Sequence, residues 1–422
     1  MANGNDPITS MVERLSDSPE LTIEEQVEVA IPNSLRPKEI MSEIIEVITE
    51  DDGSAIVDFD PQPDGPVIDE SDFYRNLAEE LDDTDLGTLA SDLLGQYEDN
   101  RETRKDWMDT YSKGLELLGF HYEQPTEPFR GATGVTHPLL AEAATQFQAQ
   151  AYNELLPPSG PVRTIIMGVV DKQKEQQSQR VKQFMNYYLT NVMEEYTPEF
   201  DQMLFYLPLA GSTFKKVYYD AALDRPVSTF VPATHLIVPY ETSSLETCPT
   251  ITHRIPMNMN DLRKQQIAGF YRDVAVSPGG STDDDQVQKE INKIDGVSHT
   301  SNDYDTEILE FHADLDIPGY EHMGDDGEPT GIKLPYIVTI CEDMNTILSI
   351  RRNYKEGDET FKKIDYFVHY KFLPGFGFYG LGLIHTIGGL SRSATTALRQ
   401  LIDAGTLSNL PAGFKARGLR IR

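Results

Sequence analysis

The amino-acid sequence predicts a mixed α+β fold, and three kinds of pattern point to it. Several long segments repeat apolar residues every three or four positions, which is the period of a helix. Other segments, such as 213–219 and 308–317, alternate apolar and polar side chains as half-buried strands do. Glycines and prolines separate these segments and predict where each element ends.

The composition sets the broad class. Of the 422 residues, 39% are hydrophobic and 25% charged, which is compatible with two or more folded domains. The two cysteines, Cys248 and Cys341, belong to no C-x-x-C motif, so we expect neither a disulfide framework nor a zinc knuckle. The sequence has no N-terminal signal and no apolar run of about eighteen residues, so we expect no membrane association.

The net charge of −33 is unevenly distributed along the chain. Residues 1–100 carry 27 acidic and 4 basic side chains and are interrupted by seven prolines. Such a segment buries too little apolar surface to offset the entropy of ordering, so we expect an acidic, largely disordered N-terminal arm. It would solvate the protein or dock on a neighbouring subunit. Within it, Leu77–Leu94 has the apolar spacing of a helix.

Folded structure is expected from Arg101 onward. Apolar spacing predicts helices at 107–118, 138–155, 172–194, 200–207, 261–267 and 287–294. Alternation predicts strands at 162–170, 213–219, 227–238, 251–255, 308–317, 336–341, 346–351 and 367–372. The two strands at 336–351 should form a hairpin around Asp343-Met-Asn345.

The stretch after the last strand is the most distinctive in the chain. Four glycines are interleaved with three aromatic residues, and we expect a structural hinge formed by Pro374, Gly375, Gly377, Gly380 and Gly382. Glycine permits positive φ and close approach of two backbones. A helix should follow, with its apolar side at Leu383, Ile387, Leu390, Ala394, Ala397, Leu398 and Leu401. Gly405 and Pro411 mark its expected end.

Gly375-Phe-Gly-Phe-Tyr-Gly380 also matches G-x-G-x-x-G, which makes a nucleotide-binding enzyme one hypothesis. A dinucleotide fold needs a further strand that ends in an acid, and only Thr406–Arg422 remain after the helix. The glycine loop Gly131–Gly134 before a helix is a second phosphate candidate, but it lacks the Gly-Lys-Ser/Thr of a P-loop. Both hypotheses are therefore weak.

The remaining chemistry-bearing residues form no recognisable site. The nine histidines include no H-x-x-x-H, and no G-x-S-x-G nucleophile motif occurs. Asp283–Asp285 lack EF-hand spacing, and His312, Asp314, Asp316 and His322 follow no known ligand order. We therefore expect no catalytic residue, no cofactor and no metal, and a structural protein rather than an enzyme.

Three strings together resemble the portal proteins of tailed bacteriophages, the head-to-tail connectors, and in particular the podovirus-like type. They are FLPGFGFYGLGLIH, the following SATTALRQLIDAGTLSN, and the upstream ILEFHADLDIPG. The resemblance extends from about Arg101 to the end of the chain. It implies a portal-like subunit with an α/β wing, a helical stem and a β-rich clip.

Under this resemblance the chain divides as follows: an N-terminal arm at 1–100, a wing-like α+β domain at 101–257, the beginning of the stem at 258–304, a β-rich clip at 305–365, the glycine turn and stem helix at 366–408, and the start of a tunnel loop at 409–422. Portal subunits continue into further wing and crown helices. We therefore expect the distal wing and crown to be missing from this sequence.

The resemblance also implies a function. A dodecameric ring at the unique capsid vertex would let double-stranded DNA pass during packaging and ejection. Its partners would be the terminase large subunit, head-tail adaptor proteins and capsid or scaffold protein, in a virion assembled in the host cytoplasm. The alternative is another virion adaptor or scaffold component.

The basic residues near the C-terminus are the candidates for contact with DNA in such a channel. They are Arg392, Arg399, Lys415 and Arg417. An acidic ring binds phosphate weakly, so sparse bases are expected to guide the DNA backbone without reading its sequence. Arg399 precedes Asp403 by one helical turn, and we expect a local ion pair between them. Arg392 has no acidic residue within one helical turn, so we expect its side chain to face the bore of the ring.

Overall fold

The computed structural model describes residues 46–49, 55–58, 72–120, 129, 131–220, 223–277, 286–296, 305–324 and 328–409. The chain divides into two units, Met1–Glu70 and Ser71–Arg422. The described part of the first unit is an antiparallel hairpin of β1 (Glu46–Thr49) and β2 (Ala55–Asp58). The rest of the expected disordered arm before residue 72, the Asp283–Asp285 segment and the expected tunnel loop lie outside the described residues.

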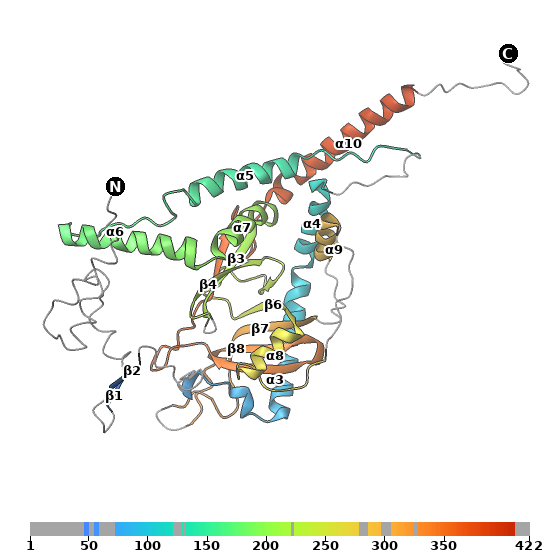
Figure 1. The fold of residues 1–422 in the computed structure, drawn as a ribbon. Coiled ribbons are helices and arrows are strands. Elements are labelled where there is room, and N and C mark those ends of the chain that lie inside the picture. The colour runs from blue at the N-terminus through green and yellow to red at the C-terminus, as the bar shows by residue number, and fades with distance from the viewer. Residues whose placement is uncertain are drawn as a thin grey trace, which may run out of the picture. The chain divides into compact units, whose positions relative to one another are not determined.

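The helices among the described residues all belong to the second unit (Figure 1). They are α3 (Asp83–Thr103), α4 (Lys105–Leu115), α5 (Leu139–Leu155), α6 (Lys172–Tyr187), α7 (Tyr196–Ala210), α8 (Met259–Ile267), α9 (Gln286–Asp295) and α10 (Leu383–Asn409). Short single turns are η1 (Asp72–Tyr74), η2 (Leu77–Glu79), η3 (Glu116–Leu118), η4 (Tyr188–Val192) and η5 (Glu342–Met344).

Two antiparallel sheets complete the unit, so the α+β class is confirmed. One has the strand order β10-β3-β4 and the other the order β5-β6-β7-β8-β9. Their bounds are β3 (Ser212–Asp220), β4 (Arg225–Pro232), β5 (Leu236–Ile237), β6 (Thr250–Asn258), β7 (Asp305–Leu315), β8 (Leu334–Cys341), β9 (Thr346–Arg352) and β10 (Phe367–Lys371). The hairpin of β8 and β9 closes at Asn345, whose φ of 51° is the left-handed conformation that asparagine tolerates.

The strand pairing does not follow the expected division into wing and clip. β6, expected in the wing, pairs with β7, expected in the clip, from Thr250↔Ala313 to Asn258↔Asp305. β10 in turn pairs with β3, about 150 residues earlier in the chain. The boundaries at 257 and 305 were wrong as limits of separate units, because one sheet runs across both.

The expected boundary at residue 100 was also wrong, since residues 72–100 are folded. α3 begins far inside the expected arm and buries Leu86, Leu93 and Tyr97. These side chains join a core with Phe311 and other residues of the five-stranded sheet. The acidic residues that suggested disorder occupy the exposed side of this amphipathic helix, and its apolar side was sufficient to fold it.

A second core lies at the other end of the unit. It is formed by α4, α5 and α7 together with the three-stranded sheet and the beginning of α10. Figure 1 shows α3 beside β7 and β8, whereas α5 and α10 lie together at the opposite end. The turn between β10 and α10 belongs to this second core through Phe378 and Tyr379.

One expected strand, 162–170, has no strand partner and bends at Gly168, whose φ is 91°. Side chains of α6 hold it instead. The Val162 N–H donates to Asn186 Oδ1 at 2.8 Å, and Ser178 Oγ donates to Thr164 Oγ1 at 2.8 Å. The alternating pattern thus arose from an extended segment that lies along a helix.

Candidate functional site: the glycine turn and helix α10

The turn at 374–382 is built against the end of α7 and the start of β3. α7 ends at Gly211, whose φ of 84° is accessible to glycine at little cost. The Phe372 N–H donates to the Gly211 carbonyl at 3.0 Å, and the Leu381 N–H to the Leu373 carbonyl at 2.9 Å. The Gly380 N–H donates to Ser212 Oγ at 2.7 Å. These bonds fix the direction in which α10 leaves the sheet.

Three glycines of the turn, Gly375, Gly380 and Gly382, are needed for close backbone approach, and Gly377 instead faces the Tyr240 ring. Gly375, Gly377, Gly380 and Gly382 all lie in the described chain, and none has a positive φ. A Cβ added at Gly380 would lie 2.8 Å from the Leu373 carbonyl oxygen, and one at Gly382 2.7 Å from the Pro208 carbonyl oxygen. Of the two roles expected of these glycines, the close approach is confirmed and the positive φ was wrong.

The aromatic residues of the turn have opposite environments. Phe378 is fully buried, with its ring centroid 4.6 Å from that of His369. Tyr379 stacks on Trp107 at 4.8 Å and donates its hydroxyl to the Leu236 carbonyl at 3.1 Å. Phe376, between two glycines, is fully exposed. The turn is therefore anchored by two rings and presents the third to solvent.

A buried arginine supports this anchor. Arg104 is 2% exposed, and its guanidinium donates to Tyr379 Oη at 3.2 Å. It also donates to three main-chain carbonyls, those of Ala233, Thr234 and Leu236, at 2.6–3.0 Å. Carbonyl dipoles thus take the place of an acid as partners of this charge, and they tie α3 and α4 to the glycine turn.

The last three amides of the turn are already bonded within the protein. The N–H groups of Gly380 and Leu381 are bonded as described, and the Gly382 N–H donates to His385 Nδ1 at 3.1 Å. In the Gly131–Gly134 loop, the Thr133 N–H donates to Asp403 Oδ1 at 2.8 Å, so a carboxylate of the protein already occupies an anion position. These contacts weigh against both nucleotide hypotheses.

Helix α10 docks on the loop before α5 through three side chains. Besides Asp403, Thr395 Oγ1 accepts from the His137 N–H at 3.0 Å, and Arg399 Nε donates to the Val135 carbonyl at 2.8 Å. The expected Arg399–Asp403 ion pair was wrong, because each side chain bonds the loop instead. The residues of α10 that are buried inside the subunit are not the apolar stripe of Ile387, Leu390, Ala394 and Leu398, for which we expect contact between subunits.

The buried positions of α10 are Ile384, Gly388, Ser391 and Thr395. The expected apolar side included Leu390, which is exposed. Gly114 of α4 leaves room for the Ile384 side chain of α10, because a Cβ at Gly114 would lie 2.7 Å from Ile384 Cδ1. The two helices therefore pack closely at this point.

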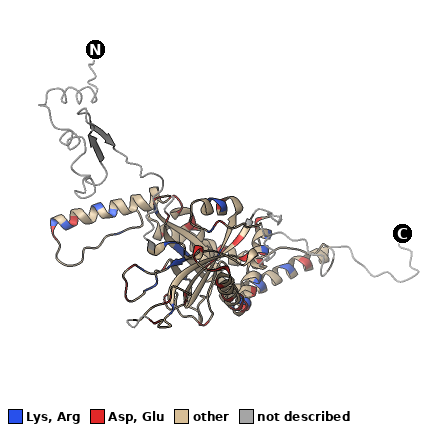
Figure 2. Cartoon of the chain, turned by 90° about the horizontal axis from the view of Figure 1, so that it is seen from below, with Lys and Arg blue, Asp and Glu red and all other residues tan. Residues whose placement is uncertain are grey.

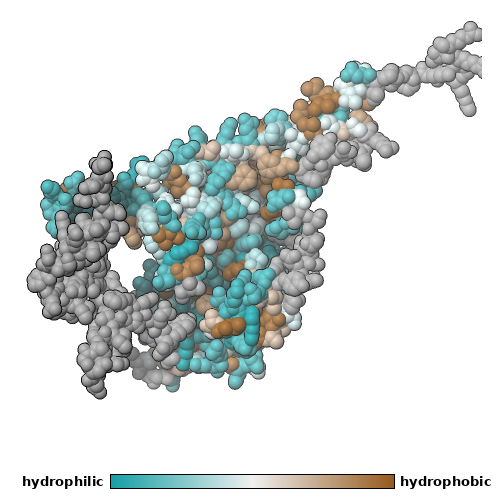
Figure 3. Space-filling model, viewed as in Figure 1, coloured by the Kyte–Doolittle hydropathy of each residue, from teal (hydrophilic) through white to brown (hydrophobic). Residues whose placement is uncertain are grey.

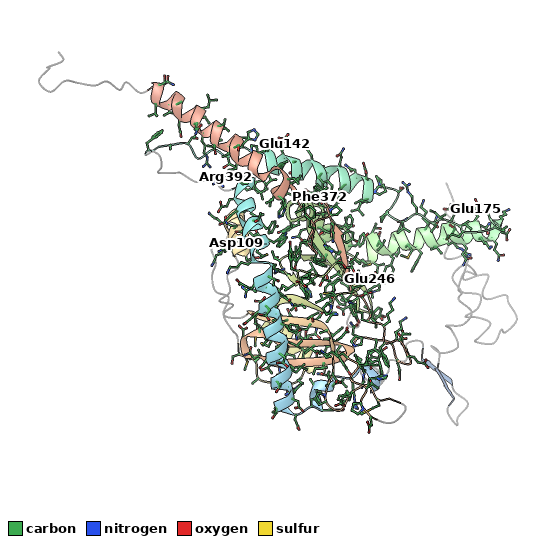
Figure 4. All side chains as sticks on the ribbon, turned by 180° about the vertical axis from the view of Figure 1, so that it is seen from behind. Asp109, Glu142, Glu175, Glu246, Phe372 and Arg392 are labelled. Atoms are coloured by element: carbon green, nitrogen blue, oxygen red, sulfur yellow. The ribbon has the colours of Figure 1, made fainter. Side chains whose placement is uncertain are left out.

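The candidate channel residues are not brought together into one patch. Arg392 is exposed on α10, and in the described part of the chain its guanidinium has no hydrogen-bond or ion-pair partner (Figure 4). Arg399 is half-buried and turned toward the loop. Lys415 and Arg417 lie outside the described residues.

Sequence reasoning missed a charged cluster that joins the two sheets. Lys216 Nζ of β3 lies 2.6 Å from Glu310 Oε1 of β7, and His312 Nε2 lies 2.7 Å from the same oxygen. Although burial opposes ionisation of Glu310, Lys216 and His312 hold its pKa well below the usual value. Lys216 and Glu310 are 94 positions apart in the sequence, and no local signal predicts this pairing.

Two further histidines have lowered pKa values, His253 beside this cluster and His369 on β10. Burial is the main cause that lowers the pKa of His253 to about 3, and nearby Lys216 lowers it further. Burial likewise lowers the pKa of His369 to about 3. Both rings pack on aromatic neighbours, His253 on Phe367 and His369 on Phe378.

Of the four residues considered above for a metal site, His312 is engaged by Glu310. Among the described residues, no group of three or more histidine, cysteine or acidic side chains is placed to hold a metal ion. A cavity of about 430 Å³ beside β8 is lined by both lysines and acids, including Lys333, Lys363 and Asp314. Its mixed charge favours no class of ligand.

Comparison with protein-family models and with curated proteins finds no match to this chain. None of the helices in the described residues is long and apolar enough to cross a lipid bilayer.

Proposed function

We propose that the chain is the subunit of a portal ring, which forms a conduit for double-stranded DNA at a capsid vertex. The observation that carries the proposal is the glycine turn with its helix. The string that resembles portal proteins is folded as a rigid joint, from which a helix of 27 residues leaves the body. A long helix aimed by a fixed joint is what the stem of a ring requires.

The charge distribution suits a conduit. DNA must move through a bore without being held, and a net charge of −33 per subunit disfavours tight phosphate binding. The exposed Arg392 would supply one weak phosphate contact per subunit in a ring. Such contacts go to the backbone, so no sequence preference is expected.

The proposal extends to the partners that the resemblance implies. Terminase would dock where the ring opens to the outside of the capsid, and adaptor proteins would replace it after packaging. ATP hydrolysis would belong to terminase, and this subunit would supply only shape and charge.

Negative-stain electron microscopy of the purified full chain tests the proposal. We expect closed rings with a central bore about as wide as a DNA duplex, and native mass spectrometry should give a single subunit number near twelve. A monomer at all concentrations, or a closed particle without a bore, would contradict it. A virion adaptor or scaffold would give bound partners without such a ring.

A further inference from the structure

Residues 160–187 form an arm, which is held together by side chains of α6. It consists of that helix and of the chain that directly precedes it. Asn186 clamps the two parts, because its Oδ1 accepts from the Val162 N–H at 2.8 Å and its Nδ2 donates to the Val162 carbonyl at 3.2 Å. Farther out, Ser178 Oγ donates to Thr164 Oγ1 at 2.8 Å. The arm is thus one built unit.

The glycine at the beginning of the arm fits this clamp. Gly160 has a φ of 92°, which glycine adopts at little cost. A Cβ at this position would lie 2.7 Å from Asn186 Nδ2, so a residue without a side chain leaves the room that the clamp needs. The Gly160 N–H also donates to the Pro157 carbonyl at 2.8 Å, which closes a turn where the arm begins.

The surface of the arm is not packed against the rest of the second unit. None of residues 160–187 is buried. The outer half of α6, Lys172–Arg180, contains no apolar residue, and Figure 3 shows this end of the helix as hydrophilic. Among the described residues, no hydrogen bond or ion pair joins the arm to the chain outside 156–192.

Figures 1 and 2 agree on how the arm is attached. In both views α6 stands away from the sheets, and one end of the helix meets the rest of the unit. Figure 2, seen from below, shows the preceding segment running beside the helix as the other limb of a hairpin. The arm is therefore attached at its base, where the chain enters it and where the chain leaves it.

The chain is fixed to the body of the unit on both sides of the arm. Before the arm, Leu156 packs against the buried side chains of α7. After the arm, Met193 is 5% exposed. Glu195 follows and binds the Arg225 guanidinium through two bonds of 2.7 and 2.9 Å. Buried contacts and a bidentate ion pair thus hold the two ends to which the arm is joined.

Two short stretches connect these fixed ends to the arm. They are residues 157–159 and η4. The second is a π-helix, in which the Met193 N–H donates to the carbonyl of Tyr188, five residues earlier, at 2.9 Å. Single π turns are rare and frequently occur at functional sites. Hinges consist of a few residues at the ends of elements that take up changes of φ and ψ, and both stretches fit that description.

We propose that the arm swings as a rigid body about residues 157–159 and η4, while α7 stays fixed. Segments with few buried side chains are the ones that open or move at least cost, and the whole arm is such a segment. The motion would carry exposed apolar side chains such as Met167, which is 92% exposed, through positions that the body cannot reach. The inference goes beyond the proposed function and does not require a ring.

Distances between pairs of spin labels on the full chain test the hinge. One label is at Lys113→Cys, an exposed position of α4, and the other is at Gln173→Cys in the arm or at Glu194→Cys just beyond η4. We expect a broad distribution of distances to position 173 and a narrow one to position 194, because the pivot lies between them. The buried Cys248 and Cys341 stay in place, and the parent chain treated with label is the blank.

A third pair of labels tests whether the arm is rigid. Arg163→Cys with Gln173→Cys lies wholly within the arm, and its distance distribution should be narrow. Asn186→Ala should broaden this distribution, because the clamp on Val162 is lost. Gln183→Ala is the matched control, an exposed position on the same helix, and it should leave the distribution unchanged.

Each contrary outcome overturns a stated part of the inference. Equally narrow distributions to positions 173 and 194 would show a fixed arm and refute the hinge. A broad distribution to position 194 would place the motion inside the body and refute the pivot at η4. A broad distribution within the arm, or an Asn186→Ala arm as narrow as the Gln183→Ala arm, would refute the clamped rigid body.

The same measurement keeps the hinge separate from the proposed function. Labelled chains are diluted with unlabelled chains, so that an assembled ring adds no distances between labels on different subunits. A chain that forms no ring should still show the broad distribution to position 173. Rings whose arms are fixed would refute the hinge and leave the conduit standing.

Discussion

At the scale of single residues, Gly380 carries the joint between β10 and α10. Its missing Cβ leaves room for the Leu373 carbonyl, which would be 2.8 Å from such an atom. The carbonyls of Leu373 and Gly211 that surround this position belong to the main chain, so they cannot rotate away. We expect Gly380→Ala to lower the free energy of unfolding by about 1–3 kcal/mol, the range for overpacking a filled site. Chemical denaturation measures the change.

Gly389 is the matched control for this prediction. It lies on the exposed side of α10 and has open space where a Cβ would be. Gly389→Ala should leave stability unchanged or raise it by up to about 1 kcal/mol, because alanine favours helix. Equal effects of the two substitutions would show that the joint does not depend on close approach.

Two buried histidines predict how stability depends on pH. The pKa of both His253 and His369 is lowered to about 3 in the folded state, whereas the unfolded value is 6.5. Below pH 6.5 the unfolded chain therefore binds protons that the folded chain does not, and stability falls as the pH drops toward 3. Between pH 6.5 and 5, each histidine should account for about 2 kcal/mol.

The variant His369→Phe isolates one of these contributions. A phenylalanine keeps the ring between Phe214 and Phe378 but cannot bind a proton. Its unfolding free energy should depend less steeply on pH between 6.5 and 5 than that of the parent chain. An unchanged slope would mean that His369 does not stay neutral in the fold.

At the scale of elements, α3 shows which features could be predicted from the sequence and which could not. Its apolar spacing was visible, but proline and acid density in the preceding residues suggested that the whole segment is disordered. The structure shows Leu93 and Tyr97 fixed by partners in the five-stranded sheet, more than 200 residues away in the chain. Long-range packing of this kind overrides local composition.

Two truncations test the corrected boundary. Removal of residues 1–70 leaves the second unit intact, so the midpoint of unfolding should change little. Removal of residues 1–100 deletes most of α3 and uncovers Phe311 and its neighbours. We expect this shorter chain to aggregate or to lose most of its stability, as followed by circular dichroism and sedimentation. Equal stability of both truncations would restore the original boundary at residue 100.

The candidate site was predictable only where its signals were local. The glycine turn, the strand before it and the helix after it were visible in the spacing of residues. The roles of Arg399, Asp403 and Thr395 were not, because their partners are in the loop at 133–137, more than 250 residues earlier. The Lys216–Glu310 pair could not be predicted for the same reason. Alternation of apolar and polar residues predicts strands but not the order in which they pair.

At the scale of the whole molecule, the two arginines of α10 should have separable roles. Arg399 Nε holds the Val135 carbonyl, so Arg399→Ala should loosen the loop at 133–137. Faster amide hydrogen exchange there, with little change of DNA retention, is the expected result. Unchanged exchange in that loop would show that the contact to the carbonyl contributes nothing.

Arg392 is the exposed cation, and its effect should appear only in the assembled ring. We expect Arg392→Ala rings to form normally but to retain double-stranded DNA less well at low salt. Each lost phosphate contact should reduce the slope of log affinity against log salt by about 1. Thr396→Ala, one turn away and uncharged, is the control. The prediction would be refuted by parental DNA retention in Arg392→Ala rings across a salt series, since that would leave the channel without its only described exposed arginine on α10.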